Sequence, residues 1–170
     1  PREICRSLRV EHTSTLSSLD PNTIYVLDGV EEIMLTQNLY MPDCTAILSS
    51  QINGNDTTLY LENNEAYTID MAWSCTVLDN ISVKWPNKTA WIYIHSGDGK
   101  TLNVVKVYNS NNGIIVEWTD LQNVVLNNIQ TYNNSDIWIS FFNTDKNPLY
   151  LNNSQSYKNG IWINLNLVVG

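Results

Sequence analysis

The sequence contains little charge, because only 15% of its 170 residues are Asp, Glu, Lys or Arg. Its three Arg (Arg2, Arg6 and Arg9) lie within the first nine residues beside Glu3, so this segment carries a charge of +2. The net charge of −8 then leaves −10 for the remaining residues. Nucleic-acid binding requires a basic patch that neutralises phosphates. We therefore expect no nucleic-acid partner.

Long apolar runs and helical periodicity are also missing. No segment approaches the roughly 18 apolar residues that a membrane-spanning helix needs. After Asp20, no ten-residue window has the 3.6-residue apolar period of an amphipathic helix. β-Branched and aromatic residues instead form short runs between clusters of Asn, Ser and Asp, which is typical of strands and turns. These features predict an all-β chain with little helix and no membrane span.

Residues that commonly form metal or catalytic sites are few. The three cysteines (Cys5, Cys44 and Cys75) form no CxxC pair, so neither a zinc site nor a disulfide framework is indicated. One disulfide plus one thiol is an alternative that the sequence leaves open.

The acidic residues also argue against catalysis. Asp70, Glu117 and Asp136 are scattered along the chain, and His95 is the one His after residue 20. Glycoside hydrolysis needs paired carboxylates. The acidic clusters at residues 31–32 and 62–65 read as exposed turns rather than calcium ligands. We therefore expect no enzyme, no metal and no cofactor.

A repeated phrase near the C-terminus organises the sequence. Leu126-Asn127-Asn128 recurs as Leu151-Asn152-Asn153, and Ile137-Trp138-Ile139 recurs as Ile161-Trp162-Ile163, at offsets of 25 and 24 residues. A period in this range is the signature of a solenoid, in which each repeat buries its apolar side against the next.

Earlier copies of the Ile-Trp-Ile strand can be traced upstream, although the first three match less well. The predicted series of seven copies is Ile24-Tyr25-Val26, Ala46-Ile47-Leu48, Ile69-Asp70-Met71, Ala90-Trp91-Ile92, Ile114-Ile115-Val116, Ile137-Trp138-Ile139 and Ile161-Trp162-Ile163. Strand alternation places the first and third residue of each copy inside. We expect residues 21–170 to form about seven rungs, preceded by an arm or cap over residues 1–20.

A second strand in each rung supplies further ladders. We expect Leu78, Leu102, Leu126 and Leu151 to form an inner ladder, continued by Ile81, Val105, Ile129 and Ser154. Tyr108, Tyr132 and Tyr157 should stack on the outside. The Asn pairs fall at the bend between strands, where Asn tolerates left-handed backbone and its amide can bond along the stack.

The LNN bends, YNN turns and inward aliphatic triplets resemble the Asn-rich repeats of the pectate-lyase-like superfamily. The resemblance covers about residues 21–170 and implies a right-handed parallel β-helix of a secreted or cell-surface protein. Members that are lyases or hydrolases use clustered carboxylates with basic residues, which this chain lacks. Related repeats often place Gly at the outward position, where this chain has Trp138 and Trp162.

The outward position of these strands predicts an apolar stripe of Trp91, Ile115, Trp138 and Trp162. A contiguous apolar patch usually marks a contact surface. We favour a protein interface over a platform for sugar rings. A covering loop, or a one-residue error in register, would remove the stripe from the surface.

The ends of the solenoid suggest the function. The C-terminal strand lacks a polar cap, and the N-terminal segment is basic and strand-like. We expect a structural subunit of an extracellular filament that assembles head to tail with copies of itself. The assembly residues would be Ile4, Leu8, Val10, Ile161, Ile163, Leu165 and Leu167. The alternatives are a fragment of a glycan-binding surface adhesin, and thirdly a polysaccharide-degrading enzyme.

Glycosylation is a further expectation, although with 24 Asn in the chain the motif also arises by chance. Asn-X-Ser/Thr sequences occur at Asn55, Asn80, Asn87, Asn133 and Asn152. A host with the necessary machinery would modify those that lie on exposed turns.

Overall fold

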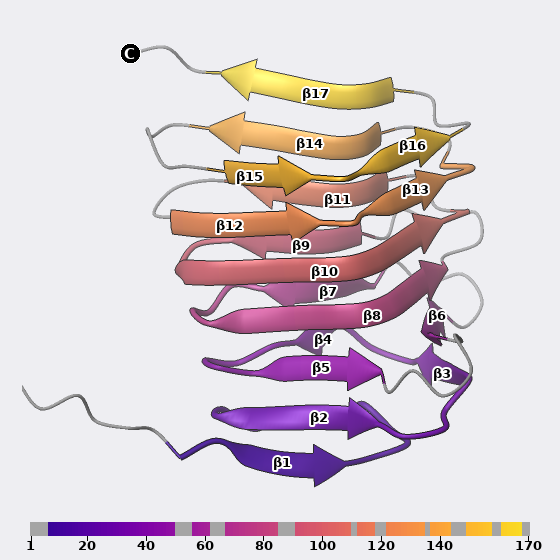
Figure 1. Ribbon diagram of the computed structural model, residues 1–170, viewed down its shortest axis with the longest axis vertical. Helices are drawn as coiled ribbons and strands as arrows, with labels where there is room; N and C mark the ends of the chain where they lie inside the picture. Colours follow the sequence, from indigo (N-terminus) through magenta and orange to yellow (C-terminus); the bar gives the residue numbers. More distant parts are fainter. Residues whose placement is uncertain are drawn as a thin grey trace, which may run out of the picture.

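The computed structural model describes residues 7–49, 56–61, 67–84, 91–109, 112–117, 122–134, 137–143, 149–157 and 161–167. These residues form a parallel β-solenoid without any helix (Figure 1). All described strand pairs are parallel, and strands follow the order of the sequence along the axis. The predicted all-β parallel solenoid is therefore confirmed.

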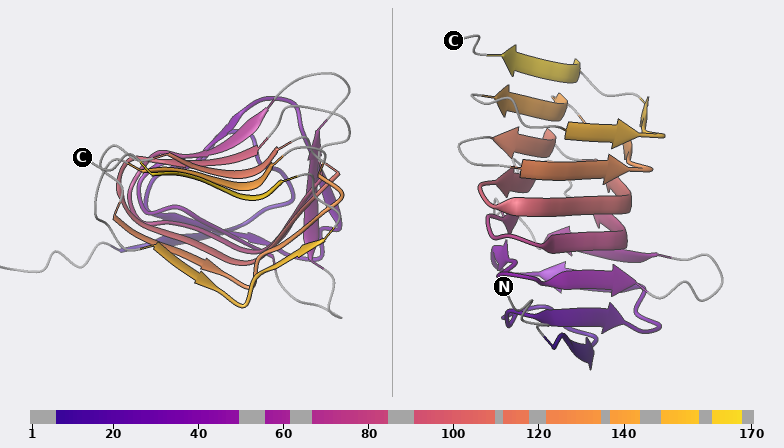
Figure 2. Two further views of the ribbon diagram at one scale, coloured as in Figure 1. Left: turned by 90° about the horizontal axis from the view of Figure 1, so that it is seen from above. Right: turned by 60° about the vertical axis from the view of Figure 1, so that its left-hand side comes forward.

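The strands form three stacks around a shared interior (Figure 2, left). Stack A contains β1 (Arg9–His12), β2 (Thr23–Leu27), β5 (Ala46–Ser49), β12 (Gln122–Asn127), β15 (Leu149–Asn152) and the first halves of β8 (Thr76–Lys84) and β10 (Asp98–Tyr108). Stack C contains β3 (Glu32–Leu35), β6 (Thr57–Leu61), β13 (Gln130–Tyr132), β16 (Gln155–Tyr157) and the second halves of β8 and β10. Stack B contains β4 (Leu39–Tyr40), β7 (Thr68–Met71), β9 (Trp91–His95), β11 (Asn112–Glu117), β14 (Ile137–Asn143) and β17 (Ile161–Leu167).

Four successive turns, from β8 to β17, repeat the same order of stacks. The chain runs through stack A, bends into stack C and returns through stack B. Two earlier passes, β2 to β4 and β5 to β7, enter the same stacks. Each turn buries its inward side chains on the turns above and below, so the core runs along the axis.

The Leu ladder of stack A is confirmed. Leu102 lies opposite both Leu78 and Leu126, and Leu126 lies opposite Leu151. Leu78, Leu102 and Leu126 are fully buried, and burial of each side chain stabilises the fold by roughly 1.5–3 kcal/mol. The continuation through Ile81, Val105 and Ile129 is also fully buried.

The outer ladders also follow the repeat. Tyr108 and Tyr132 stack with their ring centroids 4.8 Å apart, and Tyr157 lies next in register. Asn127 donates through Nδ2 to Oδ1 of Asn103 at 2.8 Å, and Asn103 donates to Asp79 at 2.9 Å. These contacts align consecutive turns on the surface, as the core ladder does inside.

The bend between stacks A and C uses left-handed backbone. Asn80, Asn128 and Asn153 have φ values of 57°, 53° and 47°, as their positions in the repeat predicted. Val104 occupies the same bend with φ of 51°. A β-branched residue in this conformation is strained, because its Cβ approaches the following carbonyl.

The prediction was wrong for the first two copies of the Ile-Trp-Ile strand. Residues 24–26 and 46–48 lie in stack A, where Ile47 is opposite Leu78. Their middle residues, Tyr25 and Ile47, are buried, whereas the flanking residues are only half-buried. Short apolar triplets look alike in both stacks, and the matching strand of stack B is the two-residue β4, which carries no repeat phrase.

The register of stack B also differs from the prediction in its centre. Ile114 lies opposite Ile139 and Ile92, rather than opposite Ile137 and Ala90. The difference is two residues, so inward residues remain inward. Ile92, Ile114 and Ile139 are accordingly fully buried.

Candidate functional site

The outer face of stack B carries the main candidate site. The inward residues Leu39, Ile69 and Ile92 are buried, so the alternate residues point away from the core. Register places Tyr40 opposite Asp70, and Asp70 opposite Tyr93. The face is therefore a column of aromatic and acidic side chains that crosses several turns.

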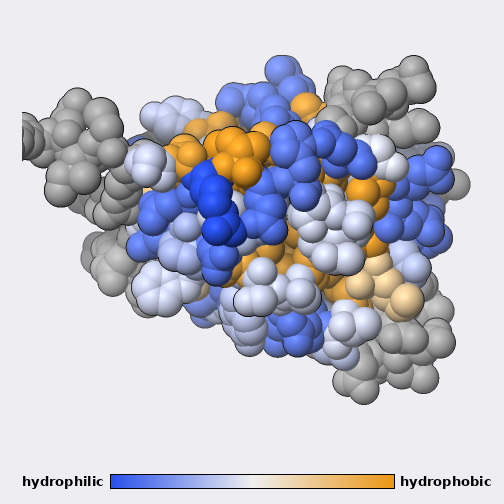
Figure 3. Space-filling view, turned by 90° about the horizontal axis from the view of Figure 1, so that it is seen from below, coloured by the Kyte–Doolittle hydropathy of each residue, from blue (hydrophilic) through white to orange (hydrophobic). Residues whose placement is uncertain are grey.

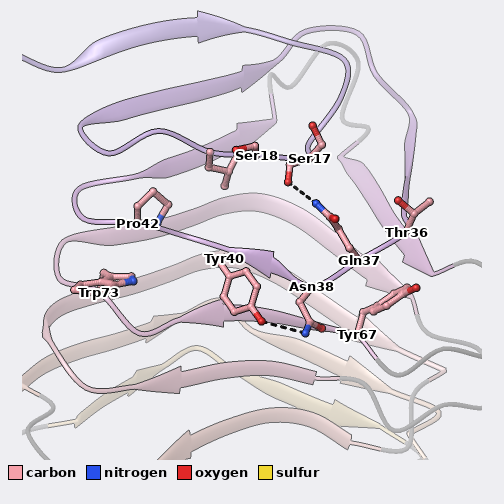
Figure 4. Close-up of a pocket in the computed structure, with 10 residues that line it drawn as sticks. Ser17, Ser18, Thr36, Gln37, Asn38, Tyr40, Pro42, Tyr67 and Trp73 are labelled. Carbon is pink, nitrogen blue, oxygen red and sulfur yellow. Dashed lines mark hydrogen bonds between the residues drawn. The ribbon is translucent and has the colours of Figure 1, made fainter.

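A groove with a volume of about 600 Å³ lies at the N-terminal end of this face (Figure 4). Its lining comes from three segments that are distant in sequence but adjacent in the solenoid: Ser17, Ser18, Leu19, Thr36, Gln37, Asn38, Tyr40, Pro42, Tyr67 and Trp73. Tyr40 and Trp73 are 60% and 58% exposed, which is unusual for large aromatic residues. The groove thus combines aromatic surfaces with hydroxyl and amide groups.

Hydrogen bonds fix the rim of the groove. Gln37 donates through Nε2 to the carbonyl of Ser17 at 2.8 Å, and Thr68 N donates to Oδ1 of Asn38 at 2.9 Å. Asn38 in turn donates through Nδ2 to the hydroxyl of Tyr40 at 3.3 Å (Figure 4). These bonds join one turn to the N-terminal segment and to the next turn, so the rim is ordered before any ligand binds.

An acidic and aromatic cluster continues the same face. His95 Nε2 lies 2.9 Å from Oδ1 of Asp70, and the His95 ring stacks on Tyr93 with centroids 4.2 Å apart. Tyr93 donates its hydroxyl hydrogen to Glu117. Burial, and then the hydrogen bond to Glu117, raises the pKa of Tyr93 to about 12. Tyr93 therefore stays protonated and acts as a donor.

This cluster is not evident from the sequence, because Asp70, His95 and Glu117 are more than 20 residues apart along the chain. Parallel stacking places residues about 25 positions apart on neighbouring strands, so sequence distance was the wrong criterion. Asp136, the remaining acid of that set, lies outside the described residues. No group of three or more His, Cys, Asp or Glu that could hold a metal occurs in the described part of the chain.

Lys100 lies inside the solenoid, opposite Thr76 and Val124. Its side chain is fully buried, and Nζ has no hydrogen-bond partner among the described residues. Burial lowers the pKa of Lys100 to about 8, although Asp43, Asp70 and Cys75 oppose that shift. The repeat pattern in the sequence did not predict that Lys100 is buried.

The residues of the predicted apolar stripe do not lie opposite one another in the structure. Ile115 lies opposite Tyr93 and Ser140, whereas Trp91 lies opposite Thr68. Since Asn112 and Ile114 lie opposite Ile137 and Ile139, Gly113 is level with Trp138. Ile115 therefore belongs to the neighbouring column. The side chains of Trp91, Trp138 and Trp162 lie outside the described residues, so the interface remains a prediction.

The candidate assembly residues are only partly described. Leu8, just before β1, is 50% exposed, and Val10, within β1, is 56% exposed. Ile4 lies outside the described residues. The residues Ile161, Ile163, Leu165 and Leu167 lie in β17, for which the backbone alone is described.

The glycosylation candidates fall into three groups. Asn80 is a poor glycosylation site, because its side chain is buried and donates a hydrogen bond through Nδ2 to the carbonyl of Ser49 at 3.3 Å. Asn133 and Asn152 are exposed. Asn55 and Asn87 lie outside the described residues.

Within the described ranges, no helix has the length and apolarity needed to cross a membrane. Comparison with known proteins finds no matching family model, no matching curated protein and no matching solved structure.

Proposed function

We propose that this chain is a non-enzymatic carbohydrate-binding β-solenoid and that the groove of stack B is its binding site. The observation that carries the proposal is the pair of exposed aromatic side chains, Tyr40 and Trp73, beside the amides of Gln37 and Asn38. A pyranose ring presents apolar C–H groups on its faces and hydroxyls at its edge. The groove offers a matching surface for each.

The volume and the charge of the groove narrow the ligand. About 600 Å³ falls within the range of about 300–1,000 Å³ that is typical of ligand pockets. Asp43 and Asp70 flank the lining residues, and none of the described residues that line the groove is Lys or Arg. An acidic surround repels uronic acids. We therefore expect a neutral oligosaccharide.

Calorimetric titration tests the proposal directly. The probes are three neutral chains (cellohexaose, xylohexaose and mannohexaose) and one anionic chain, polygalacturonate. At least one neutral hexaose should bind, and polygalacturonate should bind more weakly than it does. Failure of all neutral chains, or a preference for polygalacturonate, would count against the proposal.

Two aromatic substitutions locate the site. Trp73→Ala should weaken binding at least tenfold, or about 1.4 kcal/mol, because the stacking surface is lost. Tyr157→Ala is the matched control, since Tyr157 is 62% exposed but lies in stack C, outside the groove. Equal losses in the two variants would show that binding does not use the groove.

Self-assembly is the second candidate function, and the N-terminal strand favours it. β1 pairs with β2 alone among the described strands, and it carries the exposed Val10, with the exposed Leu8 just before it. Apolar surface appears among polar surface at this end of the molecule (Figure 3). An edge of this kind can add a strand from another copy, such as the region of β17, and would form a head-to-tail filament.

Sedimentation distinguishes the two candidates. Filament formation predicts assemblies at micromolar concentration that disappear when Leu8→Lys and Val10→Lys are introduced together. Sugar binding at stack B should survive this change. A monomer at all concentrations, in the full-length protein, would count against the filament.

The number of rungs, the handedness of the solenoid and its kinship are also proposed. We infer about seven rungs from the strand order of stack A, β1-β2-β5-β8-β10-β12-β15. We infer a right-handed solenoid because crossovers between parallel strands are right-handed in about 98% of cases. Kinship with the Asn-rich repeats of the pectate-lyase-like superfamily and an extracellular location are supported by the repeat alone.

A further inference from the structure

Cys44 and Cys75 occupy the same corner of consecutive turns, where the chain enters stack A. Cys44 N donates to the carbonyl of Ser74 at 2.9 Å. In a parallel ladder, this bond places Cys44 directly opposite Cys75. The pairing of Ala46 with Val77, two residues further along each strand, gives the same register.

The two cysteines also share one backbone conformation. Their φ values are 51° and 61°, so their Cα–Cβ bonds leave the backbone in similar directions. Strands in register lie about 4.8 Å apart. This separation falls within the Cα–Cα range of about 4.4–6.8 Å that disulfides span. The corner therefore brings two thiol-bearing side chains within bonding reach.

We propose that Cys44 and Cys75 form a redox-responsive disulfide between two adjacent turns. Cys75 is exposed and Cys44 is half-buried, so a small oxidant can reach the pair. A disulfide such as oxidised glutathione supplies the oxidising equivalents. One cysteine thiolate attacks it, forms a mixed disulfide and releases one reduced glutathione. The second cysteine thiolate then displaces the other, so two thiols become one disulfide and two glutathione thiols.

The accessibility of the pair indicates a bond that is readily reduced. Cys75 is exposed, so a reductant can reach the sulfur atoms. Exposed disulfides have higher reduction potentials than buried structural ones. The pair is therefore a switch rather than a permanent cross-link.

The disulfide would also restrain the groove, a consequence that rests on the proposed sugar-binding function. Pro42 and Trp73 line the groove, and each lies two residues before one of the cysteines. Joining Cys44 to Cys75 ties these two lining segments together. The oxidised protein should bind the neutral hexaose severalfold more tightly, because less ordering is required on binding.

The first experiment equilibrates the full chain with excess oxidised glutathione and maps the product by mass spectrometry. Thiol titration should fall by two per chain, with loss of two hydrogens and a peptide linking Cys44 to Cys75. Cys5→Ser should form the same link, and Cys75→Ser should not. A link through Cys5, an unchanged thiol titration, or accumulation of glutathione adducts would overturn the proposal.

A second measurement separates the switch from the sugar site. Mild dithiothreitol should break the bond, and the temperature midpoint of unfolding should fall as it does so. Hexaose binding is then compared in the two redox states. A mapped disulfide without any sugar binding would leave the switch intact and refute the proposed function. Sugar binding without the mapped disulfide would refute the switch alone.

Discussion

At the scale of single residues, the bends between stacks A and C show where the repeat is obeyed and where it is broken. Asn at this position adopts left-handed backbone at little cost, and three bends use it. Val104 adopts the same left-handed backbone, although its β-branched side chain disfavours that conformation. The bend is therefore imposed by the stacked turns rather than by the local sequence.

Val104→Asn should stabilise the protein by about 1 kcal/mol, because it removes the steric penalty of a β-branched residue in left-handed backbone. The matched variant Asn128→Val places the strained residue on the next turn and should destabilise by a similar amount. Urea unfolding measures both changes. Opposite signs are expected, and destabilisation by Val104→Asn would show that the Val side chain contributes more through packing than it costs in strain.

Lys100 should make stability depend on alkaline pH. Its pKa falls from 10.5 to about 8 on folding, so between these values the unfolded chain binds a proton that the folded chain does not. Stability must then rise as the pH increases from about 8 to 10.5. Below pH 8 the buried charge costs about 3 kcal/mol, as the size of the pKa shift implies. Lys100→Met should remove this cost.

Urea unfolding at pH 7.5 and 9.5 checks the prediction for Lys100. This interval lies below the ordinary pKa of Tyr, so Tyr93 does not interfere. The native protein should gain stability over the interval, whereas Lys100→Met should be more stable at pH 7.5 and change less. Lower stability of Lys100→Met at pH 7.5 would mean that the ammonium group has a stabilising partner.

At the scale of strands, the ladders explain what could be predicted. The Leu ladder of β8, β10, β12 and β15 was predicted because each of these strands carries a recognisable form of the repeat phrase. β4 was missed because two residues contain no phrase. The middle register of stack B was misjudged by two residues, because connections between its strands vary in length and alternation cannot detect an even shift.

The amide ladder of Asp79, Asn103 and Asn127 gives a prediction at this scale. Asn103 accepts from one neighbour and donates to the other. Asn103→Asp should destabilise by about 1–2 kcal/mol, because the new carboxylate cannot donate to Asp79 and repels it.

Thermal unfolding at pH 7 and at pH 3 measures this effect, with Asn103→Ala as the control. Protonation should recover part of the loss in Asn103→Asp, since a carboxylic acid can donate a hydrogen bond. Asn103→Ala should lose stability at both values. A pH-independent loss in Asn103→Asp would exclude charge repulsion as its cause.

At the scale of the whole molecule, function depends on residues that only the coiling of the chain brings together. The groove joins residues 17–19, 36–42 and 67–73, and only the last of these segments contains a predicted copy of the repeat, Ile69-Asp70-Met71. Trp73 lies between β7 and β8, where strand alternation assigns no direction to a side chain, so the sequence did not mark it as exposed. Side-chain alternation predicted the core well, whereas the site required the three-dimensional arrangement of adjacent turns.

The most direct test of the central claim is a nuclear magnetic resonance titration of the labelled full chain with the neutral hexaose that binds best. The indole N–H signal of Trp73 and the amide signals of residues 36–42 should shift together and saturate at one affinity. Shifts confined to the indoles of Trp91, Trp138 and Trp162, or no shift at Trp73 at saturation, would contradict a carbohydrate site in the groove.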